Sequence, residues 1–446
     1  MPRELTTSTA GFEAAFAAFL AEERAPEEDV ASRVRDILAA VRARGDAALI
    51  DYTHRFDRLE LTPETLRIPR TELESAAAAC PPETLEALKL AAARIETYHA
   101  KQKPEDALWT DDLGVRLGHR WTAVAAAGVY VPGGTAAYPS SVLMNLIPAK
   151  VAGVPRVVMV VPTPDGKTAP LVLAAAQLAG VDEVYRVGGA QAVAALAYGT
   201  ETIRPVDKIV GPGNAYVAEA KRQVFGQVGI DSIAGPSEIL VVADAENDPA
   251  WIAADLLSQA EHDSVAQSIL IADDAGFAEA VRRAVALHLQ RLPRSEIASR
   301  SWERHGAILL VDNLAEEAPS LIDAIAPEHL ELAVAEPEAL LPRIRNAGSI
   351  FLGRYTPEVL GDYLAGPNHV LPTARSARFA SGLSTLDFMK RSSLLGADPQ
   401  SLAALGPAAV ALAEAEGLQA HALSVAIRLQ GGMKNGRTDG PDGEAE

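Results

Sequence analysis

The sequence contains a single cysteine, Cys80, among 446 residues. One thiol cannot close an intrachain disulfide or form a paired-cysteine metal site. The length also exceeds what one hydrophobic core usually supports, so a small disulfide-stapled scaffold is excluded. We expect a reducing, cytoplasmic setting in which Cys80 is a buried or idle thiol.

Long hydrophobic runs are absent as well. No stretch approaches the roughly 18 uncharged apolar residues that are needed to span a bilayer. Residues 1–25 carry glutamates at positions 4, 13, 22 and 23, whereas a secretory signal has a basic start and an uncharged core. We therefore expect neither a membrane span nor secretion.

Basic residues are scarce relative to acidic ones. The chain has 40 Lys and Arg against 59 Asp and Glu, which leaves a formal net charge of −19. Such a charge repels a phosphate backbone, so we do not expect a nucleic-acid partner. The hydrophobic share of 48% and the charged share of 22% are typical of globular proteins and provide enough apolar material for several cores.

The pattern of apolar residues changes near residue 120. Apolar residues recur every three and four positions up to about Leu117, which predicts a helical N-terminal segment, 1–120, that packs on the core. From Ala123 onward, short Val/Ile-rich runs end in Gly or Pro and alternate with Ala/Leu-rich helical stretches, which is typical of βαβ units. The expected strands of a first group are 124–131, 156–162, 183–187 and 207–210. Those of a second group are 239–243, 268–272, 307–311, 330–334 and 349–352.

This alternation predicts an α/β fold with two Rossmann-like units, each a doubly wound parallel sheet, at 121–236 and 237–380. Strand signals stop at about Ser381, and 381–430 is expected to form a helical tail with an apolar side that needs a surface to cover. The final stretch, 431–446, is rich in Gly and charge and is expected to fray.

Glycine-rich turns follow three strands of the first unit, at 131–134, 187–191 and 210–214. Ligands of open α/β sheets bind at the carboxyl ends of the strands, where glycines allow backbone N–H groups to approach a phosphate. A nucleotide site is therefore plausible, and ordinary tight turns are the alternative. The nearest dinucleotide fingerprint, Gly211-x-Gly213-x-x-Tyr216, lacks its third glycine.

Two polar clusters occur in the second unit. Gln259 and His262 are three residues apart at the end of a predicted helix, 249–260, so they point from one face and can converge on a ligand. Alternatively, His262 only complements the helix dipole. Glu328 and His329 place a carboxylate beside an imidazole, as acid–base chemistry needs. However, they stand at the amino end of a strand, and a polar turn is the alternative.

Further candidates lie toward the C-terminus. Asp362, in a glycine-rich segment, suits a hard divalent cation, although an Asx turn would also explain it. Glu416 and His421 would stand about 140° apart on an ideal helix. If Gly417 ends one helix in the left-handed conformation and a second begins at about Leu418, both side chains can face one pocket. The alternative is a solvent-facing glutamate and a histidine that covers part of the helix pair.

Eight segments in this order resemble the histidinol dehydrogenase family, and the likeness runs from about Phe56 to Arg428. They are YVPGGTAAYPSSVLMNLIPAKVAGV (130–154), VGGAQAVAALAYGT (187–200), VDKIVGPGNAYVAEAKR (206–222), IDSIAGPSEILVVAD (230–244), DLLSQAEHD (255–263), APEHLEL (326–332), GDYLAGPNHVLPT (361–373) and AEAEGLQAH (413–421).

This resemblance implies oxidation of L-histidinol to L-histidine through an enzyme-held aldehyde, with reduction of two NAD, in the last steps of histidine biosynthesis. It implies one zinc ion per subunit and an intertwined homodimer with shared sites. The implied zinc ligands are Gln259, His262, Asp362 and, from the partner subunit, His421. These four also contact the substrate, together with Ser237, His329 and Glu416. The implied NAD contacts are Tyr130, Gln191 and Asn214. The first unit would then be the NAD side and the second the metal and substrate side.

The residue types are consistent with this chemistry. Amide, carboxylate and imidazole donors are harder than a structural Cys₄ site and leave positions open for substrate. Neutral His329 is the candidate base for the carbinol hydroxyl, and Glu328 is the candidate base for the water that adds to the aldehyde. Two alternatives are a relative that oxidises another small alcohol, such as a sulfonated diol, and a metal- or amino-acid-binding protein without catalysis.

Overall fold

The computed structural model describes residues 2–22, 30–133, 138–233 and 235–430. The chain divides into two compact units. The first contains Met1–Lys103 and Ala123–Met389, and the second contains Pro104–Thr122 and Lys390–Glu446. Within the described ranges, no helix is both long and apolar enough to cross a membrane.

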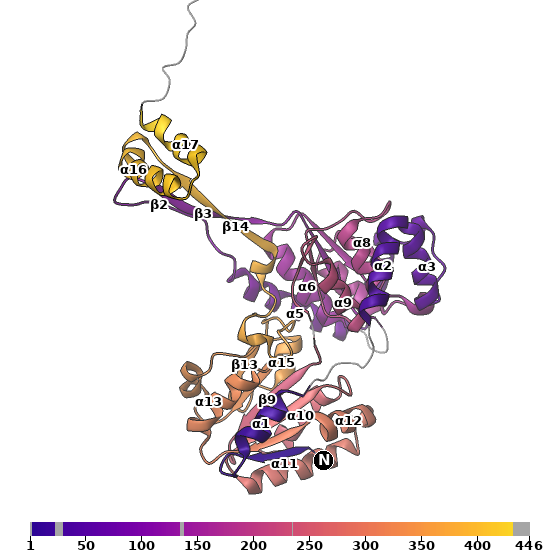
Figure 1. The fold of residues 1–446 in the computed structure, drawn as a ribbon. Helices are drawn as coiled ribbons and strands as arrows, with labels where there is room; N and C mark the ends of the chain where they lie inside the picture. The colour runs from indigo at the N-terminus through magenta and orange to yellow at the C-terminus, as the bar shows by residue number, and fades with distance from the viewer. Residues whose placement is uncertain (1, 23–29, 134–137, 234, 431–446) are drawn as a thin grey trace, which may run out of the picture. The chain divides into compact units, whose positions relative to one another are not determined.

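The first unit contains two parallel sheets (Figure 1). One has the strand order β6-β5-β4-β7-β8. Taken along the chain, this is the Rossmann order 3-2-1-4-5, in which the strand order reverses between β4 and β7. Its strands are β4 (Ala126–Tyr130), β5 (Arg156–Val160), β6 (Glu183–Tyr185), β7 (Lys208–Val210) and β8 (Gly229–Ile230).

The other sheet has the order β1-β11-β10-β9-β12-β13. Without β1 (Arg3–Thr6), it repeats the same 3-2-1-4-5 order. The remaining strands are β9 (Glu238–Ala243), β10 (Gln267–Ala272), β11 (Ala307–Leu310), β12 (His329–Ala333) and β13 (Ser349–Leu352). The α/β prediction with two Rossmann-like parallel units is thus confirmed, and every expected strand of both groups forms.

Helices cover both faces of each sheet because most residues of the central strands are apolar and buried on both sides. On the first sheet, one face packs against α4, α5, α6 and α7, and the other against α2, α3, α8 and α9. Their bounds are α2 (Val30–Arg44), α3 (Asp46–Asp57), α4 (Arg70–Ala79), α5 (Pro82–Ala100), α6 (Pro139–Ala152), α7 (Pro170–Leu178), α8 (Gly189–Tyr198) and α9 (Ala215–Val224).

The second sheet is covered in the same way. One face packs against α10 (Pro249–Ala260), α11 (Ala275–Leu289) and α12 (Ser295–His305). The other face packs against α1 (Phe12–Leu20) and α13 (Leu314–Ile325). The short helices α14 (Pro337–Leu340) and α15 (Glu358–Tyr363) flank β13 along the chain, one on each side.

Two local expectations are wrong. The sequence predicts helical structure up to about Leu117 and no strand after about Ser381, yet β2 (Ala107–Thr110), β3 (Arg116–Ala123) and β14 (Met389–Gly396) form a three-stranded sheet. These strands are largely exposed and rich in charged and hydroxyl residues. They therefore lack the continuous apolar runs by which buried strands are recognised.

The helical part of the tail does form, as α16 (Pro399–Ala415) and α17 (Gln419–Leu429). A Cβ at Gly406 of α16 would lie 2.8 Å from the side chain of Leu429, so the two helices are closely packed there. The stretch expected to fray, 431–446, lies outside the described residues, as does Gly134. The division into five segments remains a prediction.

An ion-pair cluster at the amino end of β6 yields a prediction about acid stability. Glu183 accepts hydrogen bonds from Arg156 Nε (2.8 Å), Tyr185 Oη (2.8 Å) and Arg204 Nη2 (3.2 Å). Burial raises the pKa of Glu183, but Arg156, Tyr185 and Arg204 together lower it to about 2. Because the folded-state pKa lies below the unfolded value, this stabilisation is complete above about pH 4.5 and is lost as the pH falls toward 2.

Glu183→Gln should therefore lower the free energy of unfolding at neutral pH by about 2 kcal/mol. The difference from the unsubstituted chain should be clearly smaller at about pH 3, because much of this stabilisation is lost between about pH 4.5 and pH 3. Urea unfolding at both pH values measures this, with exposed Glu60→Gln as the control. If the loss in free energy of unfolding caused by Glu183→Gln were the same at both pH values, the stabilising role assigned to the Glu183 charge would be contradicted.

Candidate active site

A cavity of about 1100 Å³ lies between the two sheets of the first unit. Pro132 and the loop 211–214, which follow β4 and β7, line it from the carboxyl ends of the first sheet. Ser237, Glu328 and His329 line it from the amino ends of β9 and β12. The second sheet thus contributes its amino end, which is why Glu328 and His329 look misplaced for a Rossmann site taken alone.

His329 is buried and oriented by the backbone of a neighbouring strand. Its Nδ1 lies 2.9 Å from the carbonyl oxygen of Glu238. A carbonyl can only accept, so Nδ1 carries the hydrogen and the neutral ring has its lone pair on Nε2. Nε2 lies 3.6 Å from Glu358 Oε1 and 3.6 Å from Asp362 Oδ1. The ring is thus fixed with a proton-accepting nitrogen toward the acidic side of the cavity.

The adjacent carboxyl, Glu328, is held by the same strand. Its Oε2 accepts a hydrogen bond of 2.9 Å from the N–H of Glu238. Burial raises the pKa of Glu328 to about 8, although the nearby His329 lowers it. Burial lowers the pKa of His329, but Glu358, Glu328 and Asp362 outweigh burial and hold it well above its usual range. Such displaced pairs are typical of sites that move protons.

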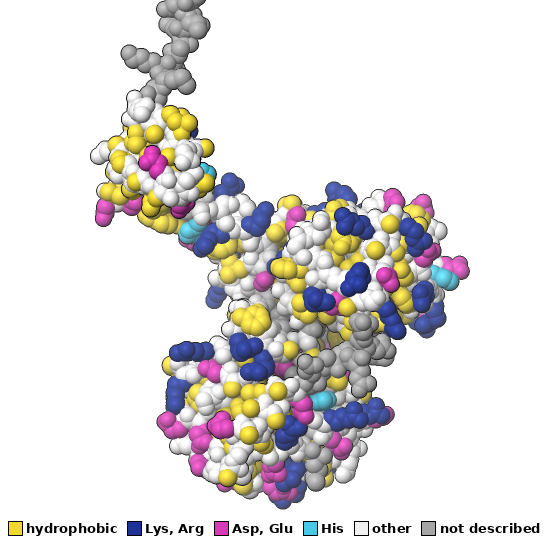
Figure 2. Space-filling view, viewed as in Figure 1, with side chains coloured by type: hydrophobic (Ala, Val, Ile, Leu, Met, Phe, Trp, Pro, Cys, Tyr) yellow, Lys and Arg dark blue, Asp and Glu magenta, His cyan; other side chains and the backbone are white. Residues whose placement is uncertain are grey.

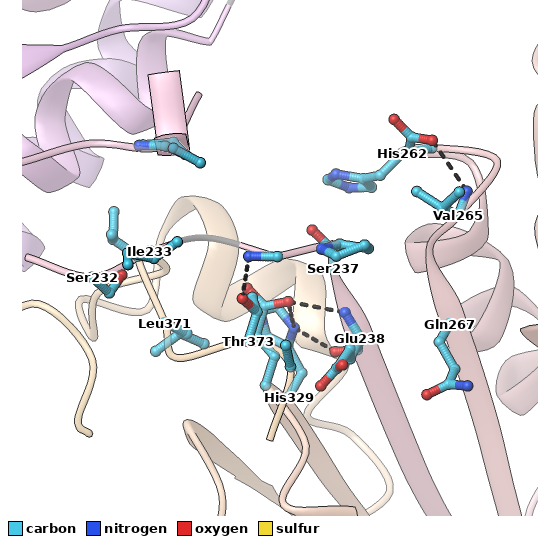
Figure 3. A pocket seen from close by; sticks show the side chains of 18 of the residues that line it. Ser232, Ile233, Ser237, Glu238, His262, Val265, Gln267, His329, Leu371 and Thr373 are labelled. Atoms are coloured by element: carbon cyan, nitrogen blue, oxygen red, sulfur yellow. Dashed lines mark hydrogen bonds and ion pairs between the residues drawn. The ribbon is translucent and has the colours of Figure 1, made fainter. Parts of the chain in front are cut away.

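Three of the predicted zinc ligands line the same cavity: Gln259, His262 and Asp362. Gln259 lies in the last turn of α10, and the N–H of His262 donates to its carbonyl oxygen (3.1 Å). In Figure 3 the His262 imidazole extends toward the segment that carries Ser237. Gln259 is only 1% exposed, and its Oε1 has no hydrogen-bond partner within the described part of the chain. A buried, unpaired amide oxygen suits a cation ligand.

Asp362 lies on α15 with a second acid, Glu358, that sequence reasoning missed. Glu358 is 2% exposed, and its Oε2 accepts a hydrogen bond of 3.0 Å from Ser258 Oγ. Ligand atoms of His329, Glu358 and Asp362 lie within 4.8 Å of one another, so this group could also hold a metal ion. A signal was available, because residues four apart share a helix face. The glycine-rich composition of the segment instead favours a loop, and that interpretation hides the shared face.

The predicted NAD contacts are divided. Asn214 lines the cavity, where its Oδ1 caps α9 by accepting from the N–H groups of Tyr216 (3.1 Å) and Val217 (3.2 Å). Tyr130 and Gln191 are buried and are not among the lining residues. The Gly189 N–H donates to Tyr130 Oη (3.0 Å), and burial raises the pKa of Tyr130 to about 12. Gln191 Oε1 is buried without a hydrogen-bond partner among the described residues.

Glu416 and His421 lie in the second compact unit, where both are exposed. Gly417 has φ = 74°, its N–H donates to the carbonyl of Glu414 (2.9 Å), and the Leu418 N–H donates to that of Ala413 (2.8 Å). This is a Schellman-type helix end, and α17 begins directly afterwards. The predicted helix break at Gly417 is confirmed.

Comparisons with known proteins agree on one family. The family model for histidinol dehydrogenase matches residues 20–429. A histidinol dehydrogenase from Rhodospirillum rubrum is 66% identical over 434 residues, which cover 97% of this chain and 100% of the relative. One from Rhizobium meliloti is 63% identical over 418 residues, covering 94% and 96%.

The fold agrees as well. The crystal structure of a histidinol dehydrogenase from Elizabethkingia anophelis superposes with a TM-score of 0.92 at 36% identity, covering 96% of this chain and 98% of that one. The residues that the family model matches include the C-terminal helices and every strand except β1. The chain belongs to the histidinol dehydrogenase family and is an oxidoreductase.

Proposed function

We propose that this chain oxidises L-histidinol to L-histidine through L-histidinaldehyde, with zinc and NAD, as a cytoplasmic homodimer in the last steps of histidine biosynthesis. The observation that carries the proposal is the buried Glu328–His329 pair in a cavity that also contains Gln259, His262 and Asp362. One cavity therefore offers proton-transfer groups and cation ligands side by side. Family membership supports the choice of substrate.

The donor set suits zinc in a catalytic role. Gln259, His262 and Asp362 of one chain would hold the ion together with the partner subunit's His421. Amide oxygen, carboxylate and imidazole donors are compatible with zinc and leave room for substrate atoms. When bound, the ion supplies a Lewis-acid centre that holds the imidazole and amine of the amino alcohol.

NAD fits the opposite side of the cavity. The loop 211–214 lies between β7 and the N-terminus of α9, an arrangement that favours a phosphate group. Tyr130, Gln191 and Asn214 remain our proposed contacts. Tyr130 and Gln191 are buried and do not line the cavity as described, so contact with NAD would require a local rearrangement around them. NAD supplies the hydride acceptor in both half-reactions.

The two half-reactions divide between adjacent side chains. In the first, His329 in its neutral form takes the proton of the carbinol hydroxyl on Nε2 as the hydride departs to NAD, leaving the aldehyde. A cation held by Asp362 would offset one of the carboxylates that raise the pKa of His329 and would so favour the neutral form. In the second, Glu328, in the carboxylate form that prevails above about pH 8, takes a proton from water as the water oxygen bonds to the aldehyde carbon. The resulting diol monoanion loses a hydride to NAD and becomes the acid. Ser237 and Glu416, together with the zinc ligands and His329, would orient the substrate between these steps.

Dimerisation is supported by uncovered apolar side chains in both units. Hydrophobic side chains gather over α16 and α17 in Figure 2, and Leu395, Leu412 and Leu423 are 76%, 67% and 59% exposed. In the first unit, Val359 and Tyr363 flank Asp362 on α15 and are also exposed. We propose that the second unit of one protomer covers α15 of its partner, so that the partner's His421 reaches the zinc site.

Substrate identity is tested by NADH formation from L-histidinol, compared with L-leucinol, an amino alcohol without an imidazole. We expect NADH and L-histidine from the first and only background turnover of the second, because the imidazole is one of the groups that the metal site holds. NADH formation from L-leucinol at a similar rate would contradict the assigned substrate. The absence of any turnover, with the fold intact, would favour a binding protein.

Removal of metal should abolish activity and leave the fold largely intact. The proposed ligands lie at the edge of a cavity, between elements that have their own apolar cores. We expect a chelator to remove turnover with little change in the circular dichroism spectrum, and added zinc to restore turnover. Full activity in protein shown by elemental analysis to contain no metal would contradict the zinc assignment.

A further inference from the structure

The NAD-side loop is held by a buried ion pair that the mechanism above does not use. Lys221, on α9, and Asp231, just after β8, have side chains that are 2% and 4% exposed. Lys221 Nζ forms an ion pair with Asp231 Oδ1. Both residues line the cavity, next to the loop 211–214. Isolating two charges from water is costly unless nearby polar groups compensate.

Those polar groups belong to the backbone of Gly211. The N–H of Gly211 donates to Asp231 Oδ2 (2.7 Å), and its carbonyl accepts from Lys221 Nζ (3.0 Å). The two charged side chains and one residue of backbone therefore form a closed ring of contacts. The Asp231 carboxylate fixes the N–H of Gly211, and the Lys221 ammonium fixes its carbonyl oxygen.

Gly211 needs such support because its conformation is unusual. Its φ is 112°, which favours glycine, and a Cβ would lie 2.1 Å from the carbonyl oxygen of Tyr130. Gly211 leads into Pro212, Gly213 and Asn214, where α9 begins. The ring of contacts thus fixes the path by which the chain leaves the sheet and presents the N-terminus of α9 to the cavity.

From this geometry we infer that Lys221 and Asp231 are positioning residues for the NAD-binding loop, an inference that rests on the proposed function. The pair sets the position of loop 211–214 before NAD binds. Disrupting the pair should weaken NAD binding and leave histidinol and zinc binding nearly unchanged. If the pair had only a structural role, its disruption would lower the stability of the protein and would weaken the binding of NAD and of histidinol to the same extent.

Two variants separate these roles. The double variant Lys221→Met/Asp231→Asn removes both charges together, so neither charge remains buried without its partner. The introduced amide oxygen can still accept from the Gly211 N–H, but the contact with the Gly211 carbonyl is lost. Asp231→Glu keeps both charges and moves the carboxylate by one methylene, which tests geometry alone. Glu183→Gln, which breaks a different ion-pair cluster outside the cavity lining, is the matched control.

NADH binding to the dimeric, zinc-loaded protein without histidinol is measured by titration of NADH fluorescence. For both variants we expect the Kd to rise by about 10-fold or more, with less than about a 2-fold change in the KM for L-histidinol. Zinc content should be unchanged, and Glu183→Gln should bind NADH normally. Failure of the unsubstituted protein to bind NADH would refute the proposed function instead.

Three outcomes would overturn the positioning role. The first is unchanged NADH affinity in both folded variants. The second is an equal loss of NADH and histidinol affinity. The third is loss of the fold in both variants, because that result would assign the pair to folding rather than to the loop.

Discussion

Replacing His329 by glutamine is expected to lower the rate of alcohol oxidation by about 10²–10³-fold and to slow oxidation of supplied L-histidinaldehyde much less. The reason is that His329 Nε2 is assigned to take the carbinol proton. The contact of Nδ1 with the Glu238 carbonyl fixes the ring so that Nε2 can do this. Glutamine has no basic nitrogen to take that proton. Single-turnover NADH formation from each substrate measures the two half-reactions separately.

Glu328→Gln should give the reverse pattern, with the larger loss in aldehyde oxidation. The carboxyl lies beside the same strand, and its contact with the Glu238 N–H can be kept by the amide oxygen. A crossover between the two variants would support one base for each half-reaction. Equal losses of both half-reactions in both variants would refute this division of labour, although not the location of the site.

A mixture of two inactive variants should recover activity. Asp362→Ala removes a proposed ligand in the first unit, and His421→Ala removes one in the second. If sites are shared between protomers, one site of each mixed dimer carries both lesions, whereas the other is intact. With random pairing, half of the dimers are mixed, so about a quarter of all sites should be active.

Co-expression of the two chains with different affinity tags allows the mixed dimers to be isolated and assayed. Each variant expressed alone serves as the control and should be nearly inactive. If every site were built within a single chain, all sites would carry a lesion. Inactive mixed dimers, shown to be folded and to contain both chains, would therefore reject the shared site.

The buried parallel sheets could be predicted because their strands are continuous apolar runs that end in Gly or Pro. The break at Gly417 could also be predicted, since a left-handed glycine between two apolar helical patterns is a local feature. The sequence also predicts that Glu328 and His329 lie at the amino end of a strand. Glu328 and His329 line a cavity because the other sheet faces this end of the strand, and no local sequence pattern predicts how two sheets face each other.

The missed features depend on contacts between distant segments. β1 has four half-exposed or exposed residues and is defined by pairing with β11, about 300 positions away. Glu358 belongs to the site because α15 places its carboxylate beside His329, a contact between segments that are distant in the sequence. The sequence does not predict the Lys221–Asp231 ion pair, because a lysine and an aspartate ten residues apart are usually both exposed to solvent.

The central claim is that one site performs two successive oxidations, and the stoichiometry of NADH tests it most directly. With L-histidinol limiting and NAD in excess, the account predicts two NADH and one L-histidine for each L-histidinol consumed, with no aldehyde released. One NADH per L-histidinol, with free L-histidinaldehyde as the final product, would contradict it.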